Sequence, residues 1–275
     1  MFEMFNLDFM VQAFVVSLII GLLLSYLGVH VVGRGIVFVD LALGQISSLG
    51  VAFSDYIGKG QTSIPIIFTL VGAFLMSLIR INDKRLKLEA IIGIIYAIAS
   101  AVTVLLISKT PHGDSDIQEV LFGNILAVSW EQITTIGIVF SIIALLHLVF
   151  YKKFFALTKA FEEGESEKIK WFSVWNFLFY TSIGLAIVFA VRTSGVIPVF
   201  SYLIIPSVSA ILLFRKNVSV IAVATIISIL GGYFGLYLSF SYDFPAGSSI
   251  VATLGAIFLI ASGFALVRRG MKKEA

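Results

Sequence analysis

The sequence predicts an all-α protein, a polytopic bundle of membrane helices that forms a single domain over residues 1–275. Three observations predict this class. Hydrophobic residues make up 59% of the chain and charged residues only 13%, whereas a soluble domain is about half apolar and about a quarter charged. The apolar residues come in stretches of about 20, the length that a helix needs to cross a bilayer. Between them, no polar stretch is long enough to form a separate soluble domain.

Nine stretches are long and apolar enough to cross a bilayer, and we expect a transmembrane helix in each. They are Phe9–Val32, Ile36–Tyr56, Ile64–Ile81, Leu88–Ser108, Glu131–Tyr151, Trp171–Val191, Val196–Phe214, Val218–Tyr242 and Ile250–Val267. A tenth apolar stretch, Ile117–Val128, is too short to cross, and we expect either a short re-entrant or interfacial helix or an ordinary loop helix there. If the chain re-enters the membrane at the turn Gly33-Arg34-Gly35, the count falls to eight and the N-terminus moves to the inner side.

The basic residues predict the orientation of these helices. If the N-terminus lies outside, all of the 19 Lys and Arg residues except Lys59, Lys109 and Arg192 fall on one side of the membrane. Positive charge accumulates in the cytoplasmic loops of membrane proteins, so that side is the cytoplasmic one. The distribution supports nine crossings and a cytoplasmic C-terminus.

The longest inner loop, Tyr151–Lys170, combines five lysines and four glutamates with several large apolar side chains. A simple solvated loop is one interpretation. A spacer would not need so many large apolar residues, so we favour a short amphipathic helix over Phe154–Phe161 that docks a cytoplasmic partner. The residues expected to take part are Phe154, Phe155, Leu157, Phe161 and Glu162.

The sequence contains no constellation typical of an enzyme. A P-loop, an HExxH motif, a GxSxG motif and cysteine are all absent from the chain. The three histidines, His30, His112 and His147, lie far apart in the sequence, and each is expected on a helix face or in a loop rather than as a metal ligand. We therefore expect no catalytic residue, no bound cofactor and no nucleic-acid partner.

Polar side chains inside apolar stretches are costly in a bilayer and therefore indicate candidate pathways. Asp40, Gln45 and Ser47 lie in the second stretch and Glu89 begins the fourth, and we assign these four to a substrate pathway or metal contact. An ion pair with Arg34, six residues earlier, is the alternative role for Asp40. On an ideal helix Asp40 and Ser47 share one face, whereas Gln45 lies about 140° away. Other polar residues in such stretches are Ser48, Tyr96, Ser100, Asn176, Arg192, Ser201, Tyr202, Ser207 and Ser209.

Five segments, in order along the chain, resemble motifs of the metal-uptake ABC permeases, the membrane subunits of zinc, manganese or chelated-iron importers. RGIVFVDLALGQISSLGVAF at 34–53 is similar to a family segment with Arg, a short apolar stretch, Asp, Leu-Ala/Ser-His and Leu/Pro-Gly-Val-Ala. The most specific match is EVLFGNILAVSWEQI at 119–133, which resembles Leu-Phe-Gly-Asp/Asn-Ile-Leu-x-Val-x-x-x-Asp/Glu. The others are LEAIIGIIYAIASAV at 88–102, AVRTSGVIPVFSYLIIPSVSA at 190–210 and SYDFPAGSSIV at 241–251.

The resemblance implies the transmembrane permease subunit of an ATP-driven importer for a transition-metal ion (zinc, manganese or iron) or a chelate of one. Two permease subunits, by default a homodimer, would work with cytoplasmic ATPase subunits that bind ATP and with an external metal-binding protein. The implied location is the bacterial plasma (inner) membrane, and the 151–170 loop becomes the ATPase-docking element. The alternative is an ATPase-independent secondary transporter or channel, although the sequence shows no clear internal repeat of the kind that such proteins use.

The sequence departs from the family at the expected metal contacts. In the zinc and manganese members, an Asp is followed one helical turn later by a His. Asp40 matches the Asp, but the His position falls on Gly44 counted from Asp40, or on Gln45 counted back from Leu49-Gly50. An amide oxygen is a harder ligand than an imidazole nitrogen, so Asp40 with Gln45 favours a harder ion such as manganese, or a chelate, over zinc.

Overall fold

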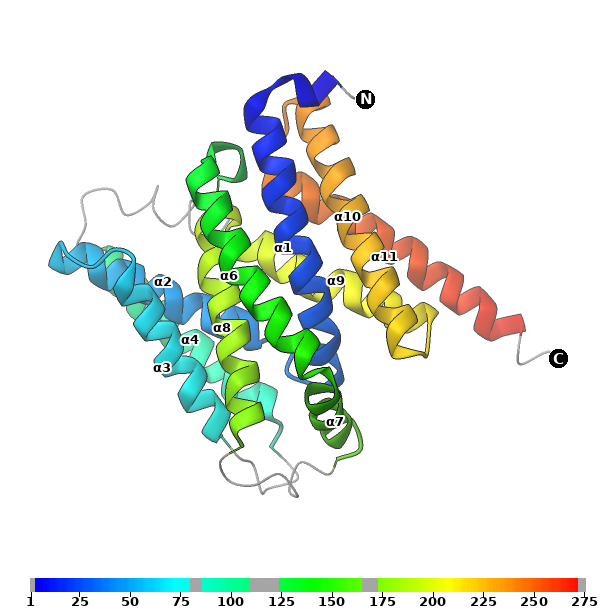
Figure 1. The fold of residues 1–275 in the computed structure, drawn as a ribbon, viewed down its shortest axis with the longest axis horizontal. Helices are drawn as coiled ribbons and strands as arrows, with labels where there is room; N and C mark the ends of the chain where they lie inside the picture. The colour runs from blue at the N-terminus through cyan, green and yellow to red at the C-terminus, as the bar shows by residue number, and fades with distance from the viewer. Residues whose placement is uncertain (1–2, 80–85, 109–123, 165–172, 272–275) are drawn as a thin grey trace. The chain divides into compact units, whose positions relative to one another are not determined.

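The computed structural model describes residues 3–79, 86–108, 124–164 and 173–271 of the 275-residue chain, and the regular secondary structure in these ranges is helical. Figure 1 shows how the helices follow one another along the chain. In order they are η1 (Glu3–Asn6), α1 (Asp8–Gly33), α2 (Val39–Ile57), α3 (Ser63–Leu78), α4 (Leu88–Ile107), η2 (Ile125–Ala127), α6 (Trp130–Val149), α7 (Tyr151–Glu162), α8 (Val174–Ser194), α9 (Val196–Leu213), α10 (Asn217–Tyr242) and α11 (Ala246–Met271).

Each stretch that was expected to cross a bilayer contains one long α-helix with boundaries shifted by a few residues, and two of the shifted starts have clear local reasons. Helix α2 begins at Val39 rather than Ile36, because Gly35 adopts a left-handed φ of 65° that interrupts the helix. Helix α11 begins at Ala246 rather than Ile250, directly after Pro245. Proline suits a helix start because the first amide groups have no partner within the helix.

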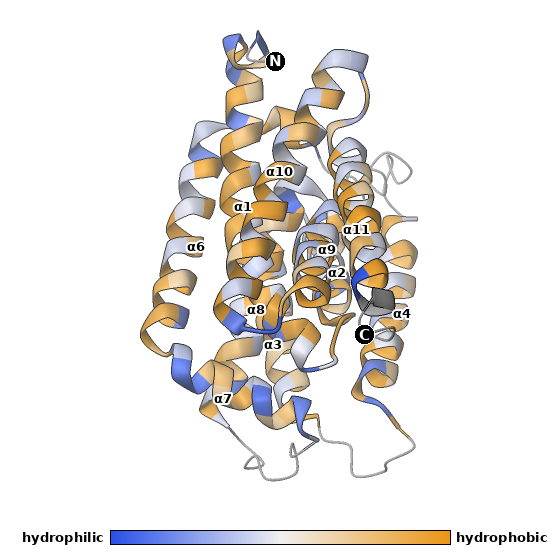
Figure 2. Ribbon diagram, turned by 90° about the vertical axis from the view of Figure 1, so that its right-hand side faces the viewer, coloured by the Kyte–Doolittle hydropathy of each residue, from blue (hydrophilic) through white to orange (hydrophobic). Residues whose placement is uncertain are grey.

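Seven of the described helices are long and apolar enough to cross a bilayer, namely α1, α4, α6, α8, α9, α10 and α11. Helix α2 is not among them, and α3 has 16 residues. The polytopic helical class is therefore confirmed, and among the described helices length and composition alone identify seven of the nine expected crossings. Of the stretch Ile117–Val128, residues 117–123 lie outside the described residues, and Ile125–Ala127 form the 3-10 turn η2. Figure 2 shows the long helices as mainly hydrophobic, with hydrophilic residues on α7 and near helix ends.

The chain divides into two compact units. Unit 1 comprises residues 1–32, 124–140 and 197–275, and unit 2 comprises residues 33–123 and 141–196. Helix α6 contributes its first half to unit 1 and its second half to unit 2.

In unit 1, small and polar residues let α1 approach α9 and α10 closely. The Ser17 hydroxyl is hydrogen-bonded to the buried Tyr202 hydroxyl, and the Ser207 hydroxyl donates to the Ser25 carbonyl at 2.9 Å. Gly28 lies directly against the Leu203 backbone. Such contacts are typical of helices that pack in lipid, where close approach replaces hydrophobic exclusion of water as the main source of stability.

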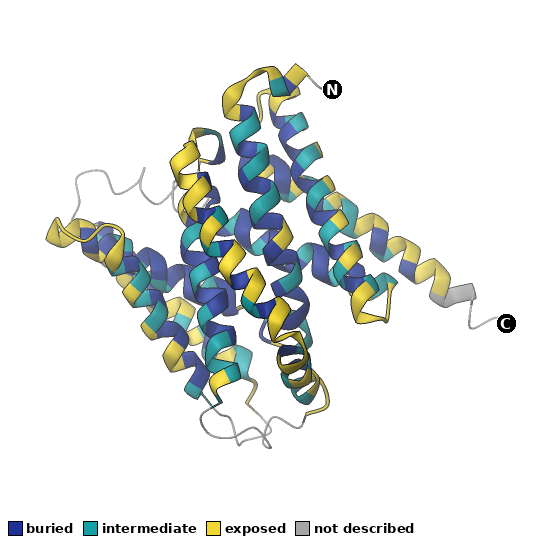
Figure 3. Cartoon of the chain, viewed as in Figure 1, coloured by how far each residue is buried: buried dark blue, intermediate teal, exposed yellow. Residues whose placement is uncertain are grey.

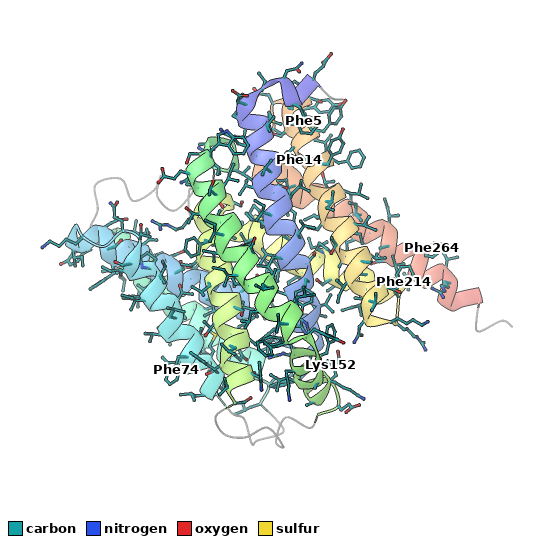
Figure 4. The ribbon with its side chains drawn as sticks, viewed as in Figure 1. Phe5, Phe14, Phe74, Lys152, Phe214 and Phe264 are labelled. Atoms are coloured by element: carbon teal, nitrogen blue, oxygen red, sulfur yellow. The ribbon has the colours of Figure 1, made fainter. Side chains whose placement is uncertain are left out.

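Aromatic side chains join the N-terminal end of α1 to α10 in the same unit. The rings of Phe5 and Phe14 lie 5.3 Å apart, edge to face, and Phe14 makes a similar contact with Tyr233 at 6.0 Å. Figure 4 shows Phe5 and Phe14 beside each other near the N-terminus. Helix α11 packs on α10 but is otherwise largely exposed, as Figure 3 shows. Its exposed side chains include Leu259 and Phe264, as expected for a surface that faces lipid.

In unit 2, α2 packs against α3, α4 and α8, and α3 also packs against α8. Glycines again set the closest approaches. A methyl group built on Gly50 would lie 2.7 Å from the Pro65 Cα atom, and one on Gly72 would lie 2.7 Å from the end of the Ile46 side chain. Unit 2 contains all four residues that the sequence assigned to a substrate pathway.

The close contact at Gly28 leads to a stability prediction. A β-carbon at this position would overlap the Leu203 carbonyl oxygen, which is backbone and cannot rotate away. We expect Gly28→Ala to destabilise the protein by about 1–3 kcal/mol, the usual cost of overpacking. The measurement is the thermal unfolding midpoint of the detergent-purified protein. Gly255→Ala is the matched control, because Gly255 has open space around it and alanine favours a helix. An unchanged midpoint for Gly28→Ala would contradict this packing.

Candidate functional site

Arg34 lies in the turn at 34–38 between α1 and α2, and its side chain is buried between α7 and α8. Nε donates a hydrogen bond to Thr158 Oγ1 and Nη1 donates to Asn176 Oδ1, both at 3.2 Å. The guanidinium carbon lies 3.4 Å from the centroid of the Phe179 ring and 5.6 Å from that of Phe161. We call these five residues the Arg34 cluster. The attraction between a cation and an aromatic face is stronger where water is excluded. Because Arg34 is only 6% exposed, its contacts with the two phenylalanine rings are of this stronger kind.

Asp40 is the second residue of α2 and is buried, with 3% of its surface exposed. Its carboxylate lies against the backbone amide groups of Asp40 and Leu41. The N-terminus of a helix favours negative charge, which explains how the carboxylate is tolerated there. Among the described residues, Asp40 Oδ1 has no hydrogen-bond partner.

The face of α2 that carries Asp40 is turned towards α8. Gly44 lies one turn after Asp40, and a methyl group built on it would make ordinary contacts with Ile187 at 3.7 Å and Val191 at 3.9 Å. Ser47 is buried and lies on the same face by helical periodicity. Gln45 is also buried, but points away from this face by the same periodicity. Two positions were considered for the family's histidine. Gly44 lies on the Asp40 face, next to aliphatic side chains of α8, whereas Gln45 lies off that face.

Glu89 lies in the first turn of α4 and is tied to the turn that precedes α2. Its Oε1 accepts a hydrogen bond from the Val37 backbone amide at 3.2 Å. The sequence assigned Glu89 to the substrate pathway, and the structure gives one of its carboxylate oxygens a structural contact. Asp40, Glu89 and Arg34 therefore lie at the same end of unit 2, where α2, α4 and α8 begin and α3 ends.

The amphipathic helix expected over Phe154–Phe161 is present as the longer helix α7, from Tyr151 to Glu162. Its apolar face is turned towards its own chain. Phe154 is fully buried, and its ring stacks on His147 at 3.9 Å and contacts Trp175 at 6.1 Å. The expectation that Phe154 contacts a partner is therefore wrong for this structure, because the residue fixes α7 to α6 and α8.

The other residues that were expected to dock a partner differ in exposure. Phe155, Leu157 and Phe161 are half-buried, and Glu162 is exposed. The outward face of α7 instead carries Lys152, Ala156 and Lys159, and Lys159 lies 3.6 Å from Glu163. Figure 4 shows Lys152 on this helix. The exposed surface of α7 thus carries mainly basic side chains, together with Tyr151.

The opposite end of unit 2 holds a second arginine. Arg192 ends α8, and its Nη2 donates to the Gln61 carbonyl at 2.8 Å, which ties α8 to the connection between α2 and α3. Within the described ranges, no three His, Asp or Glu side chains are grouped to hold a metal ion. Sequence reasoning missed Thr158 and Phe179 as partners of Arg34. Both come from helices more than a hundred residues further along the chain, and no local pattern indicates them.

Comparison with known proteins places this arrangement in a family. The sequence profile of the family described as "ABC 3 transport family" matches residues 6–265. The chain is 29% identical over 262 residues to the chelated iron transport system membrane protein YfeC of Yersinia pestis, which covers 95% of this chain and 88% of that protein. It is 29% identical over 266 residues to the manganese transport system membrane protein MntC of Listeria monocytogenes, covering 94% and 91%.

A solved structure shows the same fold. PsaBC from Streptococcus pneumoniae, determined in complex with a Fab, matches with a TM-score of 0.78 and 25% identity over 94% of both chains. The profile match extends from the start of α1 almost to the end of α11. This protein therefore belongs to the ABC 3 transport family.

Proposed function

We propose that this chain is the transmembrane permease subunit of an ATP-driven importer that carries a transition-metal ion or its chelate across the bacterial inner membrane. The observation that carries this proposal is the buried carboxylate of Asp40, whose Oδ1 has no hydrogen-bond partner among the described residues. A buried charge in a membrane helix is costly unless a cation, a donor or water meets it. A metal ion in transit would supply that cation.

Family membership supports the assignment of transport and ATP hydrolysis to different subunits. The sequence has no P-loop, so ATP hydrolysis is assigned to a separate cytoplasmic ATPase. An external metal-binding protein would deliver the ion, and a second permease subunit, by default an identical copy, would complete the membrane unit. The chain itself is proposed to be neither an enzyme nor the carrier of a cofactor.

Manganese and iron are the proposed cargo. The relatives described above are named for manganese and for chelated iron. On the Asp40 face of α2 the side-chain oxygens are the Asp40 carboxylate and the Ser47 hydroxyl, and the Gln45 amide lies about 140° away. These are hard ligands that suit manganese more than zinc. Glu89 is the further candidate at the same end of unit 2, through the carboxylate oxygen that does not contact Val37.

Nine crossings with an external N-terminus and a cytoplasmic C-terminus remain our proposed topology. Contacts at the two ends of unit 2 support helices that cross in alternating directions. Arg34, Asn176 and Ser77 meet at one end, and Arg192 and Gln61 meet at the other. Helices α2 and α8 therefore run in one direction and α3 in the opposite one. The lysines of α7 lie at the Arg34 end, which the excess of positive charge assigns to the cytoplasm.

The proposed docking element for the ATPase is the outward face of α7, with Lys152 and Lys159 as its charged residues. Phe155, Leu157, Phe161 and Glu162 border this face, and their half-buried apolar surface would add to the contact. Phe154 holds the helix in place from within. The partner surface that fits is acidic.

The first prediction concerns Asp40. Asp40→Asn removes the negative charge but keeps the size of the side chain, so folding is retained and cation binding is weakened. We expect the initial rate of ATP-dependent manganese uptake into proteoliposomes, reconstituted with the ATPase and binding protein, to fall at least about tenfold. Asp55→Asn, at the exposed other end of α2, is the matched control and should transport normally. Wild-type uptake by Asp40→Asn would move the pathway elsewhere.

The second prediction concerns the metal. Manganese, presented on the binding protein, should stimulate ATP hydrolysis by the reconstituted complex more than zinc does, because the side-chain donors on α2 are oxygen atoms. The measurement is the rate of phosphate release with each metal at matched occupancy of the binding protein. Stimulation by zinc alone would refute the assignment of cargo.

The third prediction concerns α7. The double substitution Lys152→Glu and Lys159→Glu should lower the affinity for the ATPase about tenfold, or about 1.4 kcal/mol, because it reverses the charge of the docking face. Co-purification of the ATPase and its salt dependence measure the effect. The control is Arg215→Glu with Lys216→Glu, which reverses two exposed charges between α9 and α10. An equal loss in both double variants would show that net charge, and not α7, governs binding.

A further inference from the structure

We propose that Arg34 is a positioning residue that transmits movement of α7 to the first turn of α2, and hence to Asp40. The inference rests on the proposed function and specifies how ATP hydrolysis in a partner subunit would reach the substrate pathway. Its basis is the set of contacts that the turn at 34–38 makes with three different helices.

The first link joins α7 to the turn. Thr158 lies on the inward face of α7, is 4% exposed, and accepts the hydrogen bond from Arg34 Nε. The helix also packs directly on the backbone before the turn. A methyl group built on Gly33 would lie 2.8 Å from Thr158 Cγ2 and 2.5 Å from Glu162 Oε1. A displacement of α7 must therefore shift Gly33 and Arg34 or break these contacts.

The second link fixes the guanidinium from the other side. Asn176 on α8 accepts from Arg34 Nη1, and its own Nδ2 donates to the Ser77 carbonyl at the end of α3, at 3.3 Å. The Phe179 ring covers one face of the guanidinium. Helices α8 and α3 thus form a support against which Arg34 is held on the side away from α7.

The third link runs from Arg34 to Asp40 along the backbone. The path is six residues long, and its middle is tied to α4 by the bond from the Val37 amide to Glu89. Gly35 has a φ of 65°, which gives the turn its sharp bend. Because Asp40 is the second residue of α2, a shift of the turn displaces its carboxylate before it affects the rest of the helix.

The chemistry of the cluster requires arginine rather than lysine. The planar guanidinium donates to two acceptors in different directions and still presents its face to Phe179. A lysine ammonium keeps the charge but is compact and cannot reproduce this arrangement. Arg34→Lys therefore preserves charge and separates the geometric role from a purely electrostatic one.

The experiment compares transport with ATP hydrolysis in the same vesicles. The full permease is reconstituted with its ATPase and binding protein, and the number of metal ions imported per ATP hydrolysed is measured. The variants are Arg34→Lys and Thr158→Val, which replaces a hydroxyl by a methyl group of similar size. Thr103→Val is the matched control, since Thr103 is similarly buried and, among the described residues, its hydroxyl donates within α4 to the Ala99 carbonyl.

We expect both variants to retain co-purification of the ATPase and basal ATP hydrolysis, and to import at least about fivefold fewer ions per ATP, the lower end of typical coupling between sites. Thr103→Val should match the wild type. The double variant should import as many ions per ATP as Arg34→Lys alone, because both substitutions break the same hydrogen bond between Arg34 and Thr158. If Arg34→Lys does not fold, Thr158→Val tests the same contact.

Three outcomes would overturn the inference. A normal ratio of ions to ATP in both variants would show that the cluster does not couple the sites. Loss of the ATPase from the complex would show that Arg34 supports docking and not transmission. An additive loss in the double variant would show that the two residues act separately. An absence of ATP-dependent uptake in the wild-type vesicles would refute the proposed function itself, which distinguishes the two failures.

Discussion

The structure depends on one constraint, that polar groups placed in an apolar environment must find partners within the protein. Most polar side chains of the long helices meet it locally, by donating to a carbonyl one turn earlier, as Ser48 does to Gly44 and Thr69 does to Pro65. Arg34 cannot, because a guanidinium has five donors and no acceptor. It therefore draws partners from α7 and α8, and the conformation of the turn before α2 follows from that requirement.

The same constraint explains which side chains are available for function. In the first turn of α2, the Asp40 carboxylate is partly satisfied by backbone amides, and its remaining oxygen is not satisfied by the chain among the described residues. Glu89 has one carboxylate oxygen in a structural contact. Each acid thus has one oxygen in contact with a backbone amide, and the two differ in burial, since Asp40 is buried and Glu89 is half-buried.

The positions of the long helices could be predicted from the sequence, because apolar stretches of about 20 residues are set by the thickness of a bilayer. The partners of Arg34 could not, since they follow it by 124 and 142 residues and carry no local signal. The orientation of α7 shows a different limit. Its apolar face was visible in the sequence, but an amphipathic pattern does not say whether that face binds a partner or the rest of the chain. The structure buries Phe154 against His147, which leaves the basic face outward.

The distance in sequence between Arg34 and its partners has a consequence for how the protein is made. Helices are inserted into the membrane in order, and Asn176 is synthesised 142 residues after Arg34. During that interval the guanidinium has neither Thr158 nor Phe179 beside it and is available to water and anionic lipid head groups, where a basic residue helps to orient the helices that flank it. Once α7 and α8 arrive, the same charge is withdrawn into the protein. In the proposed topology, one residue would therefore serve first to orient the nascent chain and later to join its helices.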